Sequence, residues 1–278
     1  MNFFDELYSG DKPVLSLEVI PPLKEEELDE SRRKIELLVR DSQPAYISVT
    51  RRSEGNDENT IVLCKLIQQD FGLKAVPHIT AVNHNKETLK ILEDRLKSSS
   101  LDQILVIRGD KRTDVPQGFN SSAEVIESLS SQFCIAVTAI PEGYPHEGMN
   151  AESASRYLRE KVNLGARVAL SQLFLQRVSW DRFVERNSDL NIPLIPGVMP
   201  LTSRTRLKRM IELTGLSIPF EVKNMLALSE EDFRREGIAY TASLIRSLFE
   251  SGTKGIHLFS FNSDKNTREV RDLISDLL

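Results

Sequence analysis

The chain has 278 residues, of which 40% are hydrophobic and 28% charged, as in a soluble globular protein with a sizeable core. Its net charge of −5 and pI near 5.6 exclude the strongly basic face of a nucleic-acid-binding domain. No run approaches the roughly 18 apolar residues of a membrane span, and the first residues lack the features of a signal peptide. Cys64 and Cys134 have no metal-ligand spacing, so we interpret both as reduced packing residues of a cytoplasmic protein.

Short β-branched runs alternate with amphipathic stretches along the chain, after a short N-terminal helix that could close one end of the fold. Strands are predicted at 14–20, 45–51, 74–82, 103–108, 134–140, 167–174, 193–199 and 255–261. Helices are predicted near 24–40, 57–71, 85–99, 122–132, 150–164, 179–188, 203–214 and 266–277. An extra helical region near 219–251 precedes the last strand. Asn150 is a predicted helix N-cap, and Gly165 a predicted stop.

Strands that alternate with helices of this length are typical of a parallel sheet. Eight such units, without a Gly-x-Gly-x-x-Gly turn after any strand, favour a closed barrel over an open dinucleotide-binding sheet. The sequence therefore predicts one domain, residues 1–278, with an α/β fold. This fold is a (β/α)8 TIM barrel with an extra helical segment before strand eight. The active site is expected at the C-terminal ends of the strands.

The first predicted strand carries an acidic residue on a polar face. Ser16 and Glu18 share that face, while Leu15, Leu17 and Val19 take the other. Because helices cover the outside of a barrel, the polar face is expected to point into its mouth. Burial there raises the pKa of a carboxyl, which suits a general acid. From position alone, a structural ion-pair carboxylate is an equally good interpretation of Glu18.

Other polar or aromatic residues follow the remaining strands, namely Ser48, Thr50, Arg51, Arg52, His78, Arg108, Gly109, Asp110, Pro141 to Pro145, Gln172 and Phe259. Thr50 and His78 have common alternatives, a backbone cap and a core histidine. Gly109 permits close approach of a ligand to the backbone, between a cation and a carboxylate. Gln172 can donate and accept hydrogen bonds. The ring of Phe259 could stack on a planar ligand or simply pack.

Several other chemistries find no support in the sequence. It has no phosphate-binding Gly-x-x-x-x-Gly-Lys loop and no Gly-x-Ser-x-Gly nucleophile elbow. The four histidines lack metal-ligand spacing, so no metal is expected, and His257 is interpreted as a core residue. What remains is one candidate acid, an Arg-Gly-Asp turn, an amide and hydroxyls. Such a site is typical of a protein that binds a cofactor carrying the difficult chemistry.

Taken in order, eight segments resemble the methylenetetrahydrofolate reductase family over nearly the whole chain. They are Ser16–Pro22, Ile47–Thr50, Pro77–Thr80, Arg108–Asp110, Pro141–Pro145, Lys161 with Gly165–Ala166, Gln172–Phe174 and Pro196–Pro200. The resemblance implies a flavoprotein oxidoreductase of one-carbon metabolism and methionine biosynthesis. NADH or NADPH would reduce FAD, and the reduced flavin would convert 5,10-methylenetetrahydrofolate to 5-methyltetrahydrofolate.

The resemblance also implies roles for single residues. Glu18 matches the family's acid, which protonates a folate nitrogen, and Asp110 a catalytic carboxylate between flavin and pterin. Gln172 would bind the substrate together with Asp110, and the ring of Phe259 is a further candidate there. The implied cofactor-binding residues are Thr50, His78, Arg108, Gly109, Asp110 and Lys161. The partners would be folate and a nicotinamide nucleotide, without nucleic acid or membrane, and a homo-oligomer is compatible with the family.

The chain departs from the family pattern at the expected cofactor periphery. The departing positions are Arg51, Ile140, Ala154, Tyr157, Glu160, Arg204 and Ser263. Losing one charged hydrogen bond to a phosphate costs on the order of 1.5–3 kcal/mol, although Arg51, Arg52, Lys111 or Arg112 could supply replacement charge. Two alternatives therefore stay open. One is a flavin-independent reductase with direct hydride transfer from NAD(P)H, and the other is a folate- or nucleotide-binding barrel without catalysis.

Overall fold

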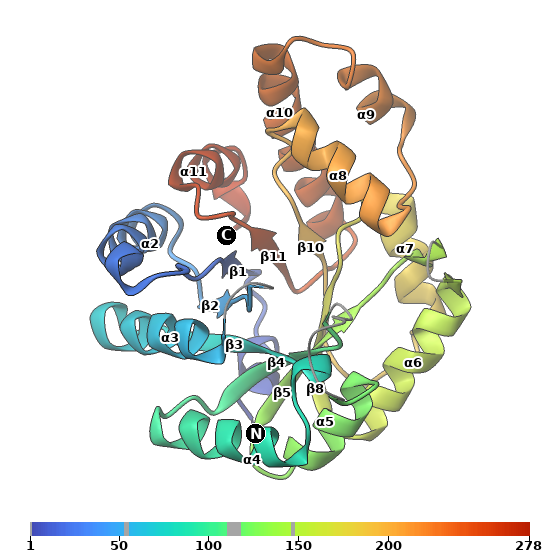
Figure 1. The fold of residues 1–278 in the computed structure, drawn as a ribbon. Coiled ribbons are helices and arrows are strands. Elements are labelled where there is room, and N and C mark those ends of the chain that lie inside the picture. Colours follow the sequence, from blue (N-terminus) through green and yellow to red (C-terminus); the bar gives the residue numbers. More distant parts are fainter. Residues whose placement is uncertain (1, 53–55, 110–117, 146–147) are drawn as a thin grey trace.

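The computed structural model describes residues 2–52, 56–109, 118–145 and 148–278. Parallel strands surround a common axis and helices form the outer layer (Figure 1). The barrel strands are β1 (Val14–Val19), β2 (Tyr46–Val49), β3 (Lys74–Thr80), β4 (Gln103–Ile107), β5 (Cys134–Ala139), β8 (Ala166–Ser171), β9 (Leu194–Ile195), β10 (Gly197–Val198) and β11 (Gly255–Phe259). A small antiparallel pair, β6 (Gly143–Tyr144) and β7 (Met149–Asn150), lies after β5.

The seventh barrel strand is broken at Pro196, which has no N–H to donate. Its first half, β9, pairs with β8, and its second half, β10, pairs with β11. The carbonyl of Pro196 accepts a hydrogen bond from the N–H of His257 at 2.9 Å, and the Gly197 N–H donates to Ser171 Oγ at 2.8 Å. The strands β8 and β11 are therefore both joined to the broken seventh strand, and this closes the sheet into a barrel. The predicted (β/α)8 barrel is confirmed.

The outer helices follow the predicted order. They are α2 (Leu28–Ser42), α3 (Asp57–Phe71), α4 (Lys86–Ser98), α5 (Ser122–Leu129), α6 (Ala151–Asn163), α7 (Arg177–Arg186), α8 (Arg204–Thr214) and α11 (Asp264–Leu273), with short 3-10 turns at Glu25–Glu27, Ala81–Asn83 and Ser275–Leu277. The predicted cap of α6 is confirmed, because the side chain of Asn150 accepts a hydrogen bond from the Ser153 N–H at 2.8 Å. Leu15, Leu17 and Val19 face these helices in the main core.

The extra helical segment before the last strand is confirmed as two helices, α9 (Phe220–Met225) and α10 (Glu230–Glu250). Figure 1 shows them grouped with α8 beside β10. Their apolar faces form a separate core cluster that includes Leu207, Val222 and Phe233. In the part of the chain that the structure describes, no helix is long and apolar enough to cross a membrane.

The N-terminal helix α1 (Phe3–Leu7) covers the end of the barrel where the strands begin. Phe4 and Tyr8 are buried in one cluster with Tyr46 and other residues from the inside of the barrel. The rings of Phe4 and Tyr46 meet edge to face, with centroids 5.8 Å apart. The predicted helix therefore does close one end of the fold. The opposite end, at the C-terminal ends of the strands, is called the mouth below.

Candidate active site

Glu18 lies near the C-terminal end of β1, at the mouth. Its register partners are Phe259 on β11 and Ser48 on β2. Its carboxyl oxygen Oε2 is 3.7 Å from Nε2 of His78 and 3.9 Å from Nε2 of His257, while 22% of the side chain stays exposed. Three titratable groups from β1, β3 and β11 therefore meet at this point.

The three groups differ in their protonation states because of burial. Burial raises the pKa of the Glu18 carboxyl to about 7. Burial also lowers the pKa values of His78 and His257 to about 3, the charge of His78 adding to the effect on His257. Both imidazoles are therefore neutral when Glu18 titrates, and they cannot form an ion pair with it. Within the described ranges no lysine or arginine pairs with Glu18, whose nearest titratable neighbours are these two histidines.

A polar layer lies directly beneath Glu18. Nδ1 of His257 is 2.8 Å from Ser16 Oγ, and Nε2 is 3.1 Å from Ser48 Oγ. The imidazole also stacks on Tyr46, with ring centroids 6.2 Å apart. His257 is buried, as predicted, but its place under Glu18 was missed. The available signal was strand alternation, since His257 has the same parity as Phe259 and therefore faces the same side of β11.

The backbone around Glu18 is tied to the end of β11. Ser260 Oγ donates to the Glu18 carbonyl at 2.6 Å. The side-chain amide of Asn262 donates to the carbonyl of Ile20 at 2.7 Å and accepts from the Ile20 N–H at 2.8 Å. Phe261 and Asn262 have φ values of 49° and 57°, in the left-handed region that most residues avoid. These three hydrogen bonds fix Glu18 and the segment after it against the end of β11.

A second group of polar residues contains two cations. Lys161, in the last turn of α6, is buried and donates to the carbonyl of Thr138 at 2.9 Å. Its ammonium nitrogen also lies 4.7 Å from the ring centroid of Tyr157. Burial, and to a lesser extent the positive charge of Arg108, lower the pKa of Lys161 to about 8. Two like charges near one another, one after β4 and one on α6, form a natural place for an anion.

Gly109 has a conformational reason to be glycine. Its φ is +82°, and a Cβ atom there would lie 3.0 Å from both Thr80 Cβ and Val82 Cγ2. Arg108 Nε donates to the Gly109 carbonyl at 3.4 Å. The glycine therefore lets the chain turn tightly against the end of β3. Asp110, the next residue of the predicted turn, lies outside the described residues, as do Lys111 and Arg112.

The remaining predicted site residues have partners within the protein. Gln172 Nε2 donates to the Tyr144 hydroxyl at 3.2 Å, and its Oε1 accepts from the N–H of Leu173 at 2.9 Å. Phe259 meets His257 edge to face, with centroids 5.8 Å apart. The backbone N–H of Thr50 continues the pairing of β2 with β1 by donating to Val19 at 2.9 Å. All of these residues follow strands that end at the mouth.

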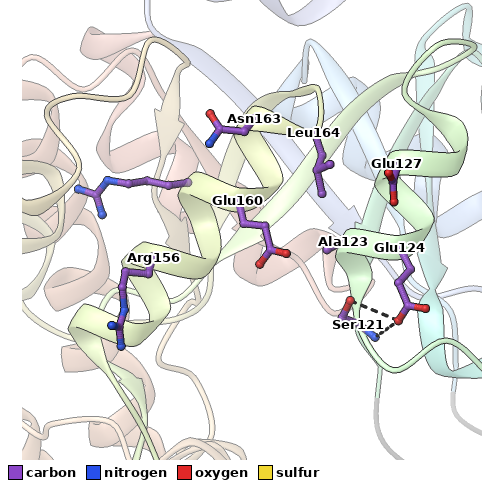
Figure 2. Close-up of a pocket in the computed structure, with 9 residues that line it drawn as sticks. Ser121, Ala123, Glu124, Glu127, Arg156, Glu160, Asn163 and Leu164 are labelled. Carbon is purple, nitrogen blue, oxygen red and sulfur yellow. Dashed lines mark hydrogen bonds between the residues drawn. The ribbon is translucent and has the colours of Figure 1, made fainter.

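Several departing positions also have structural explanations. Arg51 donates to Asp57 at 2.9 Å, so its charge is already balanced. Tyr157 shares a 3.3 Å hydrogen bond with Ser122. Glu160 is exposed and lines a groove of about 490 Å³ between α5 and α6, on the outer layer of the molecule (Figure 2). That groove contains no predicted site residue, and Glu160 does not share the buried environment of Lys161.

Fold and site together define a class. The protein is a parallel barrel with a carboxyl of raised pKa at its mouth and two cations, Arg108 and Lys161, in a second polar group, and its described residues contain no cluster of metal ligands. A sequence model described as methylenetetrahydrofolate reductase matches residues 4–274. The chain therefore belongs to the methylenetetrahydrofolate reductase family, as the sequence motifs indicated.

Similar proteins cover the chain to different extents. The 5,10-methylenetetrahydrofolate reductase of Buchnera aphidicola is 28% identical over 94% of this chain and 95% of its own length. Methylenetetrahydrofolate reductase 1 of Schizosaccharomyces pombe is 26% identical over 97% of this chain, which spans only 48% of that relative. A solved structure of an uncharacterized Clostridium thermocellum protein, described as binding two copies of 5-methyl-5,6,7,8-tetrahydrofolic acid, has a TM-score of 0.72 at 16% identity. That match covers 98% of this chain and 97% of the other.

Proposed function

We propose that the protein reduces 5,10-methylenetetrahydrofolate to 5-methyltetrahydrofolate, with electrons from NADH or NADPH that pass through bound FAD. The observation that carries the proposal is Glu18, whose largely buried carboxyl has its pKa raised to about 7 at the mouth of a barrel of this family. Relatives named for this activity support the substrate, and the described ligand of the Clostridium thermocellum protein supports folate binding.

Glu18 would act as the general acid. A neutral carboxyl donates its proton to a folate nitrogen while the bond between that nitrogen and the methylene carbon breaks, and the electron pair stays on the nitrogen. The five-membered ring opens to an iminium, which accepts hydride at the methylene carbon. Burial favours this transfer because the acid is still protonated near neutral pH. We propose Gln172, Asp110 and Phe259 as the residues that bind and orient the folate.

The described residues fit a flavin nucleotide. Nε2 of His78 is buried and has no hydrogen-bond partner among the described residues, so the polar edge of a heterocycle would satisfy it. The electrostatic effect of Arg108 on Lys161 indicates that two cations lie near one another, which suits an anionic diphosphate. We therefore propose Thr50, His78, Arg108, Gly109, Asp110 and Lys161 as the residues that hold FAD. When bound, FAD supplies the hydride that it has received from the nicotinamide nucleotide.

The affinity for FAD is expected to depend on the charge of Lys161. Because the pKa of Lys161 is about 8, the dissociation constant should rise about tenfold between pH 7 and pH 9 as the ammonium loses its proton. In Lys161→Arg the cation persists at both pH values, so this dependence should disappear. Quenching of flavin fluorescence during titration measures both constants. The same pH dependence in both proteins would contradict the role of Lys161.

One observation favours the flavin-independent alternative. Lys161 already contacts the Thr138 carbonyl and the ring of Tyr157, and Tyr157 is one of the departures from the family. An absorbance spectrum of the purified protein decides between the two mechanisms. Flavin bands, with turnover that is lost when FAD is removed, are expected for the proposed mechanism. A colourless protein with full turnover and no response to FAD would select direct hydride transfer, and folate binding without NADH consumption would select the non-catalytic barrel.

A further inference from the structure

An arginine and an aromatic ring meet at the rim of the mouth. Arg206 lies in the first turn of α8, which follows the seventh barrel strand and therefore begins near its C-terminal end. Phe261 is two residues beyond the end of β11, at the same rim. The guanidinium carbon of Arg206 lies 4.2 Å from the ring centroid of Phe261, which is a cation–π contact.

This pair has a defined position relative to Glu18. Phe261 stands between Ser260 and Asn262, which bond to the backbone of Glu18 and of Ile20. The left-handed backbone at Phe261 and Asn262 is held by these same contacts. The ring and the guanidinium on it are therefore coupled to the strand that carries the acid.

The charge of Arg206 is not balanced within the described part of the chain. Arg204, in the same turn, donates to Glu230 at 2.8 Å and to the carbonyl of Leu228 at 2.6 Å. The side chain of Arg206 makes no hydrogen bond or ion pair there, and burial lowers the pKa of its guanidinium. A partly buried cation without a counter-charge is costly unless an anion joins it. Helix α8 adds Lys208 and Arg209 but no acidic residue in its first two turns, so the local field is positive.

We propose that Arg206 binds the carboxylate end of the folate substrate and thereby selects for it. This inference rests on the proposed function, which places the pterin ring at Glu18. In a folate the glutamate carboxylates lie at the far end of the molecule from the pterin, beyond an aminobenzoyl ring. A guanidinium at the rim, held flat by Phe261, can accept such a carboxylate with two parallel hydrogen bonds.

The experiment compares two ligands that differ at the glutamate carboxylates, which are charged in one and esterified in the other. Binding of 5-methyltetrahydrofolate and of its dimethyl ester is measured by calorimetry on the wild type, Arg206→Gln and Lys208→Gln. The wild type should bind the acid about tenfold more tightly than the ester, as expected for one charge-assisted contact at a partly exposed site. Arg206→Gln should lose this preference by weakening the acid alone. Lys208→Gln removes a charge from the same helix and should keep the preference.

Each other result has a defined meaning. Equal binding of acid and ester by the wild type, or an unchanged preference in Arg206→Gln, would overturn the assignment of Arg206 and leave the proposed function intact. Equal weakening of both ligands in Arg206→Gln would show a packing role instead. If Arg206→Gln raised the KM for NADH while folate binding was unchanged, the anion would be a nucleotide phosphate, and the inference would be wrong. A wild type that binds neither ligand would refute the proposed function as well.

Discussion

Glu18→Gln is expected to slow folate reduction by at least about 100-fold, because an amide cannot donate the proton that opens the folate ring. The substitution keeps the size of the side chain, so the neighbouring His78 and His257 should stay in place. In the proposed mechanism, reduction of the flavin by NADH needs no acid, so this step should keep its rate. Stopped-flow measurement of the two half-reactions separates these effects. Glu127→Gln, on the outer groove, is a control that removes an exposed carboxylate.

The pH dependence provides a second test of the same residue. The pKa of the Glu18 carboxyl is raised to about 7, so folate reduction should be fastest below pH 7 and should slow as the pH rises through 7. The raised pKa also makes the stability of the fold depend on pH. The contribution of Glu18 to the free energy of unfolding is fully present below the pKa of the unfolded chain and is lost as the pH rises through 7. Glu18→Gln should therefore lose less stability than the wild type between pH 5 and pH 8. Folate turnover at the normal rate in Glu18→Gln would refute the role of the acid.

Gly197→Ala is expected to lower the free energy of unfolding by roughly 3 kcal/mol or more, as severe overpacking does. A methyl group at this position would overlap the carbonyl oxygen of Ser171 and would lie 2.7 Å from Cζ of Phe259. Neither group can move freely, because one belongs to the backbone of β8 and the other is packed against His257. The junction of β10 with β8, which is the seam that closes the barrel, would have to open.

Urea denaturation of the wild type, Gly197→Ala and Gly10→Ala measures this effect. A Cβ atom on Gly10 would meet nothing within 4 Å, so Gly10→Ala should change the free energy of unfolding by less than about 0.5 kcal/mol. If both variants were equally stable, close packing at the seam would not be what requires glycine at position 197.

The order of the helices and strands could be predicted from the sequence, whereas the residues at which they begin and end could be predicted less well. Alternation with a period of two, and amphipathic stretches with a helical period, indicate strands and helices from local sequence alone. The predicted strand at 193–199 is interrupted at Pro196, which has no N–H to donate to a neighbouring strand. The predicted strand at 74–82 ends at Thr80, where a 3-10 turn begins. Such ends depend on hydrogen-bond partners from other strands, which a local pattern does not contain.

The inward position of Glu18 beside Ser16 followed from the sequence itself, because strand side chains alternate and the other face of β1 is apolar. Only the tertiary structure placed His257 beneath that carboxyl, since Ser16 and His257 are 241 residues apart and meet when the barrel closes. The same holds for Arg206 on Phe261, and for Arg51, whose charge is balanced by Asp57. The buried environment that raises the pKa of Glu18 is built by three strands. Local sequence patterns thus identify the residues of the site, whereas their protonation states and their contacts with one another depend on the closed barrel.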